Sequence, residues 1–299
     1  MDRTKTIAGL TLLLAVAAGS CGINKPNIRV GSKNFTEQVV LGEIIAQHLE
    51  NRLQQKVERR LNLGGTLLAH GALLNHEIDL YPEYTGTALT AILKDAPDND
   101  SNRVLMQVRS EYANRFHVAW LDPLGIDNSF AMVVSGADAR AKHLNNLTDA
   151  AIIGSGWVLG VGYEFQQRPD GLAALDRVYH LHWTGSPQTM DLGLLYKALE
   201  GNQVTMIAAN ATDGLLSKLD LKVLTDDKHA FPPYQVSIAA SQDRLRDTPG
   251  MREALQELSG KFTNQTMQQL NYQVDGEHRP ISQVAAEFLK EIYGTPYGK

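Results

Sequence analysis

The feature that most constrains this chain is a regular alternation of short apolar segments with longer amphipathic ones, which begins at residue 28. The first apolar segment, IRVGS at 28–32, has the length of a buried strand. The segment 36–53 that follows is helical in spacing, because its apolar residues Val40, Leu41, Ile44, Ile45 and Leu49 fall on one face. Asn34, followed three residues later by Glu37, predicts a capping box at the start of this helix.

The same cycle repeats twice more along the chain. Strand-like 57–63 precedes helical 66–77, and strand-like 78–81 precedes helical 84–93. Such alternation is typical of an α/β fold, in which helices cover both faces of a largely parallel sheet. The sequence therefore predicts a largely parallel sheet in this first part of the chain.

A second series of strands and helices follows the segment 117–135, in which two strand-like runs flank a turn. We expect two α/β lobes joined by crossover strands near residues 129 and 235. The first lobe would comprise 27–128 together with 236–299, and the second would comprise 129–235. This is the plan of a hinged two-lobed binding protein, and also of some two-domain enzymes.

Residues 1–21 have the composition of a secretory signal peptide. Arg3 and Lys5 precede an apolar run of about a dozen residues, and small residues then lead to Cys21. A cysteine in this position is similar to a bacterial lipobox, in which the thiol is lipidated, although ordinary secretory cleavage beside an incidental cysteine is the alternative. No second apolar run approaches the ~20 residues of a membrane span. We expect an exported protein, periplasmic or at the cell surface, anchored to a membrane through Cys21.

Composition and short motifs disfavour several other functions. The formal net charge of −5 offers no basic footprint for nucleic acid. Cys21 is the single cysteine, so neither an intrachain disulfide nor a thiolate zinc cluster is possible. The nine histidines show no HExxH spacing, and the chain carries neither GxSxG nor a phosphate-binding loop. We therefore expect no metal, no cofactor and no enzymatic activity.

Polar and aromatic residues gather where the predicted strands end. They include 31–34, 81–87, 128–130, Arg168, 210–213 and Tyr234. Ligands of open α/β sheets bind at the carboxyl ends of the strands, where helix N-termini point. The accumulation of these residues at such positions predicts one binding site.

Several of these segments resemble motifs of a known family. They are GSKNFTEQ (31–38), EIDLYPEYTGTAL (77–89), NSFA (128–131), EFQQRPDG (164–171), ATDG (211–214) and DDKHAFPPY (226–234). In this order they resemble the substrate-binding proteins of bacterial ABC importers for quaternary-ammonium osmoprotectants such as glycine betaine, choline and carnitine. The resemblance spans about residues 28 to 292 and implies a type II periplasmic-binding-protein fold, with one ligand between two lobes. It also implies delivery to a transmembrane permease that a cytoplasmic ATPase powers.

The resemblance also implies which residues bind the ligand. An aromatic cage for the trimethylammonium group would consist of Tyr84, Phe130 and Tyr234, and the anionic end of the ligand would meet Lys33, Thr87 and Arg168. Two positions depart from the family pattern. Phe130 stands where tyrosine is common, and Asn210 stands where relatives often carry a cage aromatic. Because an amide offers hydrogen bonds and no ring face, we hypothesise a ligand with additional polar groups, such as carnitine or an ergothioneine-like betaine of histidine.

Each candidate residue also has a structural interpretation. Arg168 could pair with Asp170 or Glu164, and Lys33 could be a solvated residue at a helix start. The tyrosines of 81–84 could cap the lobe interface, and Asp213 could hold a turn. Trp157 or Trp183 could replace the missing cage ring, although a core position is the simpler expectation. At the level of function, a sensory binding module and a hydrolase with its active site in the cleft remain as alternatives to transport.

Overall fold

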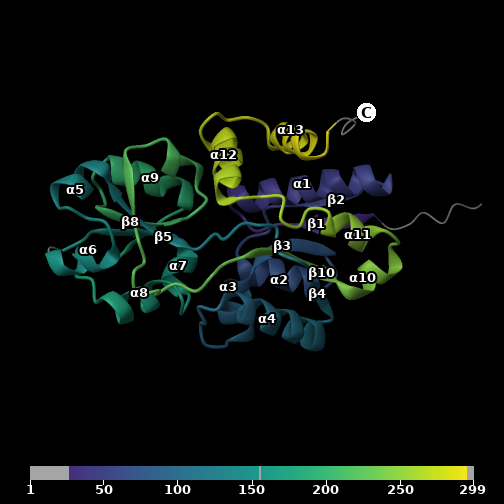
Figure 1. The fold of residues 1–299 in the computed structure, drawn as a ribbon, viewed down its shortest axis with the longest axis horizontal. Coiled ribbons are helices and arrows are strands. Elements are labelled where there is room, and N and C mark those ends of the chain that lie inside the picture. The colour runs from purple at the N-terminus through teal and green to yellow at the C-terminus, as the bar shows by residue number, and fades with distance from the viewer. Residues whose placement is uncertain (1–26, 155, 295–299) are drawn as a thin grey trace, which may run out of the picture.

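The structure is a computed structural model that describes residues 27–154 and 156–294. The predicted signal peptide and Cys21 lie outside the described residues. Two five-stranded sheets lie at opposite ends of an elongated molecule, and two chain segments join them (Figure 1). We call each sheet with its helices a lobe.

The sheet of lobe 1 has the strand order β2-β1-β3-β10-β4. β1 runs parallel to β2 and β3, whereas β10 runs antiparallel to both β3 and β4. The bounds are β1 (Ile28–Gly31), β2 (Val57–Arg60), β3 (Leu80–Tyr84), β4 (Val118–Trp120) and β10 (Val236–Ser241).

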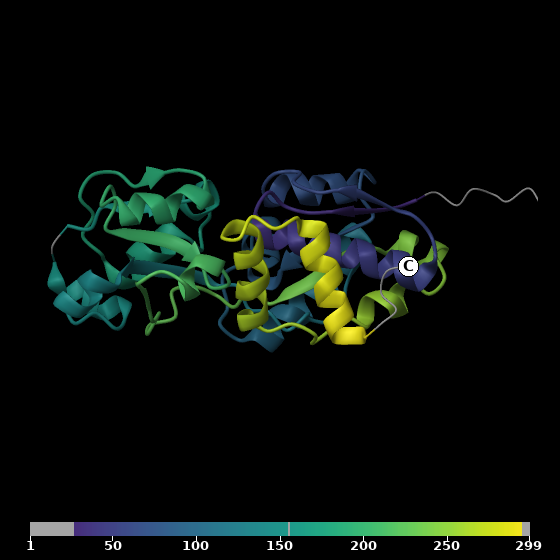
Figure 2. The same cartoon turned by 90° about the horizontal axis from the view of Figure 1, so that it is seen from above.

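Helices from both ends of the chain cover this sheet. The yellow C-terminal helices α12 and α13 lie against the purple helix α1 in both views (Figures 1 and 2). The helices of lobe 1 are α1 (Thr36–Leu53), α2 (Thr66–Leu74), α3 (Thr85–Thr87), the π-helical turn η1 (Ala88–Leu93), α4 (Ser101–Phe116), α10 (Gln242–Asp247), α11 (Met251–Gln256), α12 (Asn264–Asp275) and α13 (Ile281–Tyr293).

Helix α1 keeps its predicted bounds but begins differently from the prediction. Its N-cap is Phe35, which makes no side-chain capping hydrogen bond, so the predicted capping box of Asn34 and Glu37 is wrong. The Glu37 side chain turns to distant residues instead, as described below. The apolar face of α1 is correct, because Leu41, Ile44 and Ile45 are all buried.

The sheet of lobe 2 has the strand order β7-β6-β8-β5-β9. β6 runs parallel to β7 and β8, and β5 runs antiparallel to β8 and β9. The elements are β5 (Phe130–Ser135), α5 (Gly136–Ala141), α6 (Leu147–Ile153), β6 (Leu159–Val161), α7 (Tyr163–Gln167), α8 (Leu172–Tyr179), β7 (Gln188–Thr189), α9 (Leu192–Glu200), β8 (Met206–Asn210), the 3₁₀ turn η2 (Gly214–Ser217) and β9 (Leu221–Leu224).

Both sheets are therefore mixed, although β1, β2 and β3 of the first part of the chain are parallel to one another, as predicted. The strands that break the pattern, β5 and β10, are the ones that follow a passage of the chain from one lobe to the other. Because each enters its sheet from the cleft, it runs opposite to the strands that end at the cleft. The start of β5 consequently lies beside the end of β8, as the pair Phe130 with Asn210 shows. The start of β10 likewise lies beside the end of β3, as the pair Val236 with Tyr84 shows.

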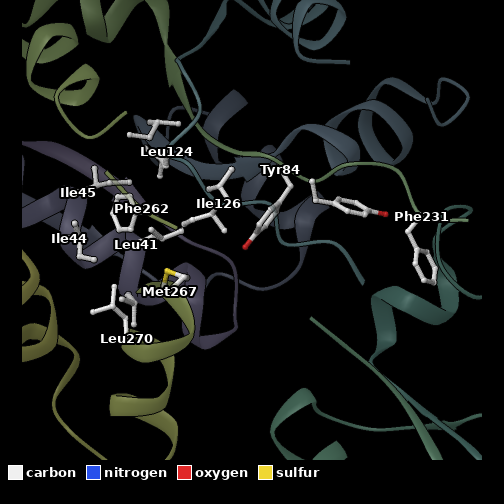
Figure 3. Packing of buried hydrophobic residues seen from close by; sticks show 14 of the residues in the cluster. Leu41, Ile44, Ile45, Tyr84, Leu124, Ile126, Phe231, Phe262, Met267 and Leu270 are labelled. Carbon is white, nitrogen blue, oxygen red and sulfur yellow. The ribbon is translucent and has the colours of Figure 1, made fainter. Parts of the chain in front are cut away.

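The two connecting segments, 121–129 and 225–235, are held to one another. Asp127 forms an antiparallel bridge with Gln235, and the Asn128 amide donates to the Tyr234 carbonyl at 3.1 Å. Leu124 and Ile126 of the first segment pack with Leu41 and other side chains of lobe 1 (Figure 3). In the part of the chain that the structure describes, no helix has the length and apolar character needed to cross a bilayer.

Candidate ligand-binding site

A cavity of about 1070 Å³ lies between the lobes. All seven residues predicted to bind the ligand line it: Lys33, Tyr84, Thr87, Phe130, Arg168, Asn210 and Tyr234. Strand ends explain this convergence. Tyr84 and Asn210 are the last residues of β3 and β8, and Phe130 is the first residue of β5.

Lys33, which follows β1, is buried, with 1% of its surface exposed. Its ammonium group donates to Glu83 Oε1 at 2.6 Å and to Thr66 Oγ1 at 3.2 Å. It also lies 4.5 Å from the centre of the Tyr84 ring. Lys33 is therefore not the solvated residue of the structural interpretation, but half of a buried ion pair at the wall of the cavity.

Arg168, at the end of α7, joins lobe 2 to lobe 1. Its Nε and Nη2 atoms donate to the Asp170 carboxylate at 2.9 and 2.5 Å, and its Nη1 atom donates to Thr87 Oγ1 at 2.8 Å. The ion-pair interpretation of Arg168 is thus confirmed for Asp170, and Arg168 in addition connects the lobes.

Two further contacts cross between the lobes on the same side of the cavity. Asp170 accepts from Thr90 Oγ1 at 2.7 Å, and Glu164 accepts from the Thr66 amide at 2.7 Å. We call the set of Glu164, Arg168 and Asp170 with Thr66, Thr87 and Thr90 the charged bridge. Burial raises the pKa of the Asp170 carboxyl, but the hydrogen bonds and charge of Arg168 outweigh this effect, so the pKa lies below its usual value.

The rings of the predicted cage belong to a larger aromatic cluster. Phe130 makes edge contacts with Tyr234, Phe231 and Phe165, at centroid distances of 5.4, 5.6 and 4.8 Å. The Arg168 guanidinium lies 5.3 Å from the Phe130 centroid and 5.4 Å from that of Tyr234. Figure 3 shows Tyr84 at the edge of the lobe 1 core, next to Ile126, and Phe231 farther away, beside the teal ribbon of lobe 2.

Tyr234 has little room to move. Its hydroxyl donates to Asp170 Oδ2 at 2.7 Å. Its ring packs directly on the backbone of α3, because a Cβ atom at Gly86 would lie 2.9 Å from Tyr234 Cδ1 and 2.6 Å from the Pro233 carbonyl oxygen. Glycine at position 86 is thus required for this close approach.

Asn210 is held by the turn that follows it. The Asp213 carboxylate accepts from the Asn210 amide at 3.1 Å, from its side-chain nitrogen at 3.5 Å and from the Tyr196 hydroxyl at 2.8 Å. Burial raises the pKa of Asp213 to about 6. Asp213 therefore fits the turn-holding role considered from the sequence, although it also lines the cavity.

Neither tryptophan replaces the missing cage ring. Trp157 is buried in lobe 2 and donates to the Ala150 carbonyl, whereas Trp183 donates to Asp176. Neither residue lines the cavity, so the expectation of a core position is confirmed for Trp157, and Trp183 packs against the same core. The additional ring is that of Phe165, on α7, which lines the cavity beside Phe130. It lay within the quoted motif EFQQRPDG but was not singled out.

Glu37 and Asn128 were also not predicted as parts of the site. The Glu37 carboxylate, 2% exposed, accepts from Tyr84 Oη at 2.6 Å, from Asn128 Nδ2 at 2.9 Å and from Thr212 Oγ1. We call these four residues the Glu37 hub. Burial raises the pKa of the Glu37 carboxyl above its usual value, although the three donors oppose this effect.

The described residues contain no group of three or more histidine, cysteine, aspartate or glutamate side chains arranged to hold a metal ion. The lining of the cavity includes aromatic faces, the cations of Lys33 and Arg168, each paired with a buried carboxylate, and the hydrogen-bonded carboxylates of Glu37 and Asp213, for which no ion pair is found among the described residues. Such a lining suits a small ligand that carries charges of both signs.

Comparison with known proteins identifies the family. The sequence profile of a family described as the substrate binding domain of the ABC-type glycine betaine transport system matches residues 26–291. The chain belongs to this family. The resemblance inferred from the motifs is thereby confirmed, and so is the function of an ABC-type substrate-binding protein.

Individual relatives agree with this assignment to the glycine betaine family. OpuCC, a carnitine transport binding protein of Listeria monocytogenes, is 32% identical over 300 residues, which cover 97% of this chain and 97% of OpuCC. EgtU, an ergothioneine transport permease/ergothioneine binding protein of Helicobacter pylori, is 32% identical over 271 residues, which cover 90% of this chain but 48% of EgtU.

A solved structure of a glycine betaine/carnitine/choline ABC transporter matches the fold with a TM-score of 0.76 at 30% identity, over 90% of this chain and 99% of that chain. The predicted type II periplasmic-binding-protein fold of this family is confirmed.

Proposed function

We propose that the cleft captures a quaternary ammonium compound with an anionic end and delivers it to the permease of an ABC importer. The observation that carries this proposal is the convergence, in one cavity, of three aromatic rings with Lys33 and Arg168 from both lobes. A trimethylammonium group donates no hydrogen bonds, so aromatic faces and negative charge are the partners that it can use.

The energies require contacts at both ends of the ligand. Each aromatic face contributes roughly 0.5–2 kcal/mol to binding of a cation, whereas micromolar affinity corresponds to roughly 8 kcal/mol. A carboxylate at the other end would take the remaining hydrogen bonds. Arg168 Nη1 is the guanidinium nitrogen that Asp170 does not engage, and with the Thr87 hydroxyl it offers a site for one carboxylate oxygen.

Asn210 supports a ligand with a hydrogen-bond donor near its quaternary end. Its side-chain nitrogen points to Asp213, which leaves the amide oxygen as the group available to a ligand. The hydroxyl of carnitine or the ring N–H of a histidine betaine could donate to it. We therefore propose a preference for such polar betaines over glycine betaine and choline, and the named substrates of OpuCC and EgtU are of this kind.

The location that we propose rests on the family of the protein and on the predicted signal peptide. Substrate-binding proteins of ABC importers work outside the cytoplasmic membrane, and we propose that a lipid on Cys21 tethers this one to a membrane surface. A Cys21→Ala variant should then appear in the soluble extracytoplasmic fraction, whereas the parent chain stays with membranes. Equal distribution of the two chains would refute the anchor.

We propose further that the cleft binds without chemical turnover. The carboxylates of the charged bridge and of the Glu37 hub are each engaged by two or more donors, which leaves them poorly placed as general bases. Incubation with a choline ester should release no choline, and measurable hydrolysis would contradict this proposal.

The function is tested by calorimetric titration of the mature chain with glycine betaine, choline, carnitine and ergothioneine. Carnitine or ergothioneine should bind more tightly than glycine betaine. In an Asn210→Tyr variant, which supplies a ring and removes the amide, this preference should shrink or reverse. The absence of binding to every quaternary amine would refute the proposed function, whereas tight binding of glycine betaine with no gain for polar betaines would refute only the preference.

A further inference from the structure

The Glu37 carboxylate is buried without a cation beside it. In the cleft, Glu83 pairs with Lys33 and Asp170 pairs with Arg168. Among the described residues, no lysine, arginine or histidine forms an ion pair with Glu37, whose partners are two hydroxyls and an amide. A buried carboxylate of this kind is costly to keep charged unless positive charge comes close.

Glu37 lines the cavity, and the ring whose hydroxyl it holds is Tyr84. A ligand cation bound against the part of the Tyr84 ring that Lys33 does not cover would therefore lie near a carboxylate that lacks a cation. The ligand proposed above brings such a charge permanently, and it has no N–H groups at its quaternary nitrogen that would compete with the three donors for the Glu37 carboxylate.

The Glu37 hub also joins the lobes. Thr212 belongs to the loop after β8, between Asn210 at the end of the strand and Asp213. Its own backbone is fixed from lobe 1 and the connecting segment, because its amide donates to Asn128 Oδ1 at 3.2 Å and its carbonyl accepts from Asn271 Nδ2 at 2.9 Å. The hydrogen bond from Thr212 to Glu37 thus links a wall of the cavity in lobe 2 directly to the carboxylate behind Tyr84 in lobe 1.

We propose that Glu37 is a positioning residue that couples a quaternary cation held against Tyr84 to the placement of lobe 2 through Thr212. The inference rests on the proposed function. The cation favours the charged carboxylate, and the charged carboxylate strengthens the hydrogen bonds from the Tyr84 and Thr212 hydroxyls. Binding and lobe placement are then linked reciprocally.

This linkage gives binding a pH dependence with a defined sign. Because the pKa of Glu37 is raised in the free protein, acidification protonates the carboxyl and removes the charge that attracts the ligand, so affinity falls. The loop after β8 presents Asp213, whose pKa of about 6 adds a second titration. The other charged groups near the Glu37 hub are Lys33 and Glu83 beside Tyr84, Asp127 next to Asn128, and Asp275, which accepts from Thr36.

The test uses calorimetric titration with carnitine and with glycine betaine from pH 8 to pH 5, together with small-angle X-ray scattering to follow ligand-induced compaction. Glu37→Gln keeps the shape of the side chain and removes its charge. Glu50→Gln makes the same change on the same helix, where the carboxylate pairs with Arg59 away from the cavity. Thr212→Val removes the link to lobe 2, and Asp213→Asn removes the second titrating group.

Glu37→Gln should weaken binding roughly tenfold at pH 8, within the usual range for coupled sites. The pH dependence of affinity that comes from Glu37 should be absent in this variant and present in Asp213→Asn. Glu50→Gln should bind like the parent. Thr212→Val should weaken binding and reduce compaction while keeping the Glu37 titration.

Unchanged affinity and pH profile in Glu37→Gln, with a parent chain that binds, would overturn this inference alone. Unchanged compaction in Thr212→Val would overturn the coupling to lobe 2. A parent chain that binds no quaternary amine would overturn the proposed function and the inference together.

Discussion

The two sets of contacts that join the lobes use carboxylates in opposite ways. In the charged bridge, Asp170 is paired with the Arg168 guanidinium, and the pKa of Asp170 is lowered despite burial. In the Glu37 hub, burial prevails over three neutral donors and the pKa of Glu37 is raised. The carboxylate Asp170 of the charged bridge is paired with a cation of the protein, whereas the carboxylate of the Glu37 hub is paired with none in the part of the chain that the structure describes.

The difference indicates how a ligand with two charges would be oriented. The charged bridge can yield an N–H group of Arg168 to an anion, since Nη1 is bound only by the Thr87 hydroxyl and lies 3.6 Å from Glu164. The Glu37 hub offers a carboxylate without an ion pair among the described residues, and the Lys33 ammonium beside Tyr84 is already paired with Glu83. A zwitterion would therefore place its carboxylate toward Arg168 and its quaternary nitrogen toward Tyr84.

The largest effect is expected from breaking the charged bridge. Arg168→Met leaves the Asp170 carboxylate buried without its cation, which should lower the free energy of unfolding by about 3–5 kcal/mol in urea denaturation and should abolish ligand binding. The double variant Arg168→Met/Asp170→Leu removes both charges and should recover most of the stability but not the binding. If Arg168→Met alone were as stable as the parent, the ion pair of Arg168 with Asp170 would make no contribution to stability.

The aromatic rings should come next. Tyr84→Ala and Tyr234→Ala each remove one face, which should weaken binding by about 3- to 30-fold in calorimetry. Tyr84→Phe and Tyr234→Phe are matched controls that keep the ring and remove only the hydroxyl bound to Glu37 or Asp170. Should the phenylalanine variants bind as poorly as the alanine variants, the hydroxyl contacts and not the ring faces would account for affinity.

The two sets should also respond oppositely to acid. Because the pKa of Asp170 is lowered in the folded protein, its contribution to stability is present above the unfolded pKa and is lost as the pH falls through the folded value. Because the pKa of Glu37 is raised, its charged form opposes folding at neutral pH, and protonation relieves this opposition.

Urea denaturation between pH 7 and pH 4 separates these contributions. Glu37→Gln should be more stable than the parent at pH 7, and this advantage should shrink toward pH 4. Asp170→Asn should be less stable at pH 7, with a deficit that shrinks as the pH falls. A Glu37→Gln variant less stable than the parent at neutral pH would contradict the account of the Glu37 hub.

The smallest effect should come from a hydroxyl of the charged bridge. Thr87→Val removes the acceptor of Arg168 Nη1 and should cost about 1 kcal/mol of stability in urea denaturation. Thr87→Ser keeps the hydroxyl and should restore most of it. A loss of stability in Thr87→Ser with none in Thr87→Val would assign the effect to the methyl group instead.

Much of the site could be predicted because it follows from strand ends. Tyr84 and Asn210 terminate β3 and β8, so the rule that ligands bind at the carboxyl ends of strands places them together. The motifs identified Lys33 and Arg168 as site residues but did not indicate how each is buried and paired. Nothing local to Lys33 indicates that Glu83, 50 residues away, would bury it as an ion pair.

What could not be predicted depends on contacts between distant residues. A local rule assigned Glu37 to a capping box, but its partners Asn128 and Thr212 lie 91 and 175 residues away and outweigh the local alternative. The antiparallel direction of β5 and β10 likewise results from the passage of the chain between the lobes, and the spacing of apolar residues does not predict strand direction.

The most direct test of the central claim compares two ligands of the same shape. The parent chain is titrated with carnitine and with its carbon isostere, in which a neutral tert-butyl group replaces the trimethylammonium group. Carnitine should bind at least about tenfold more tightly, because only the charged group gains from the aromatic faces and from Glu37. Equal affinity for the two, or binding of neither, would contradict it.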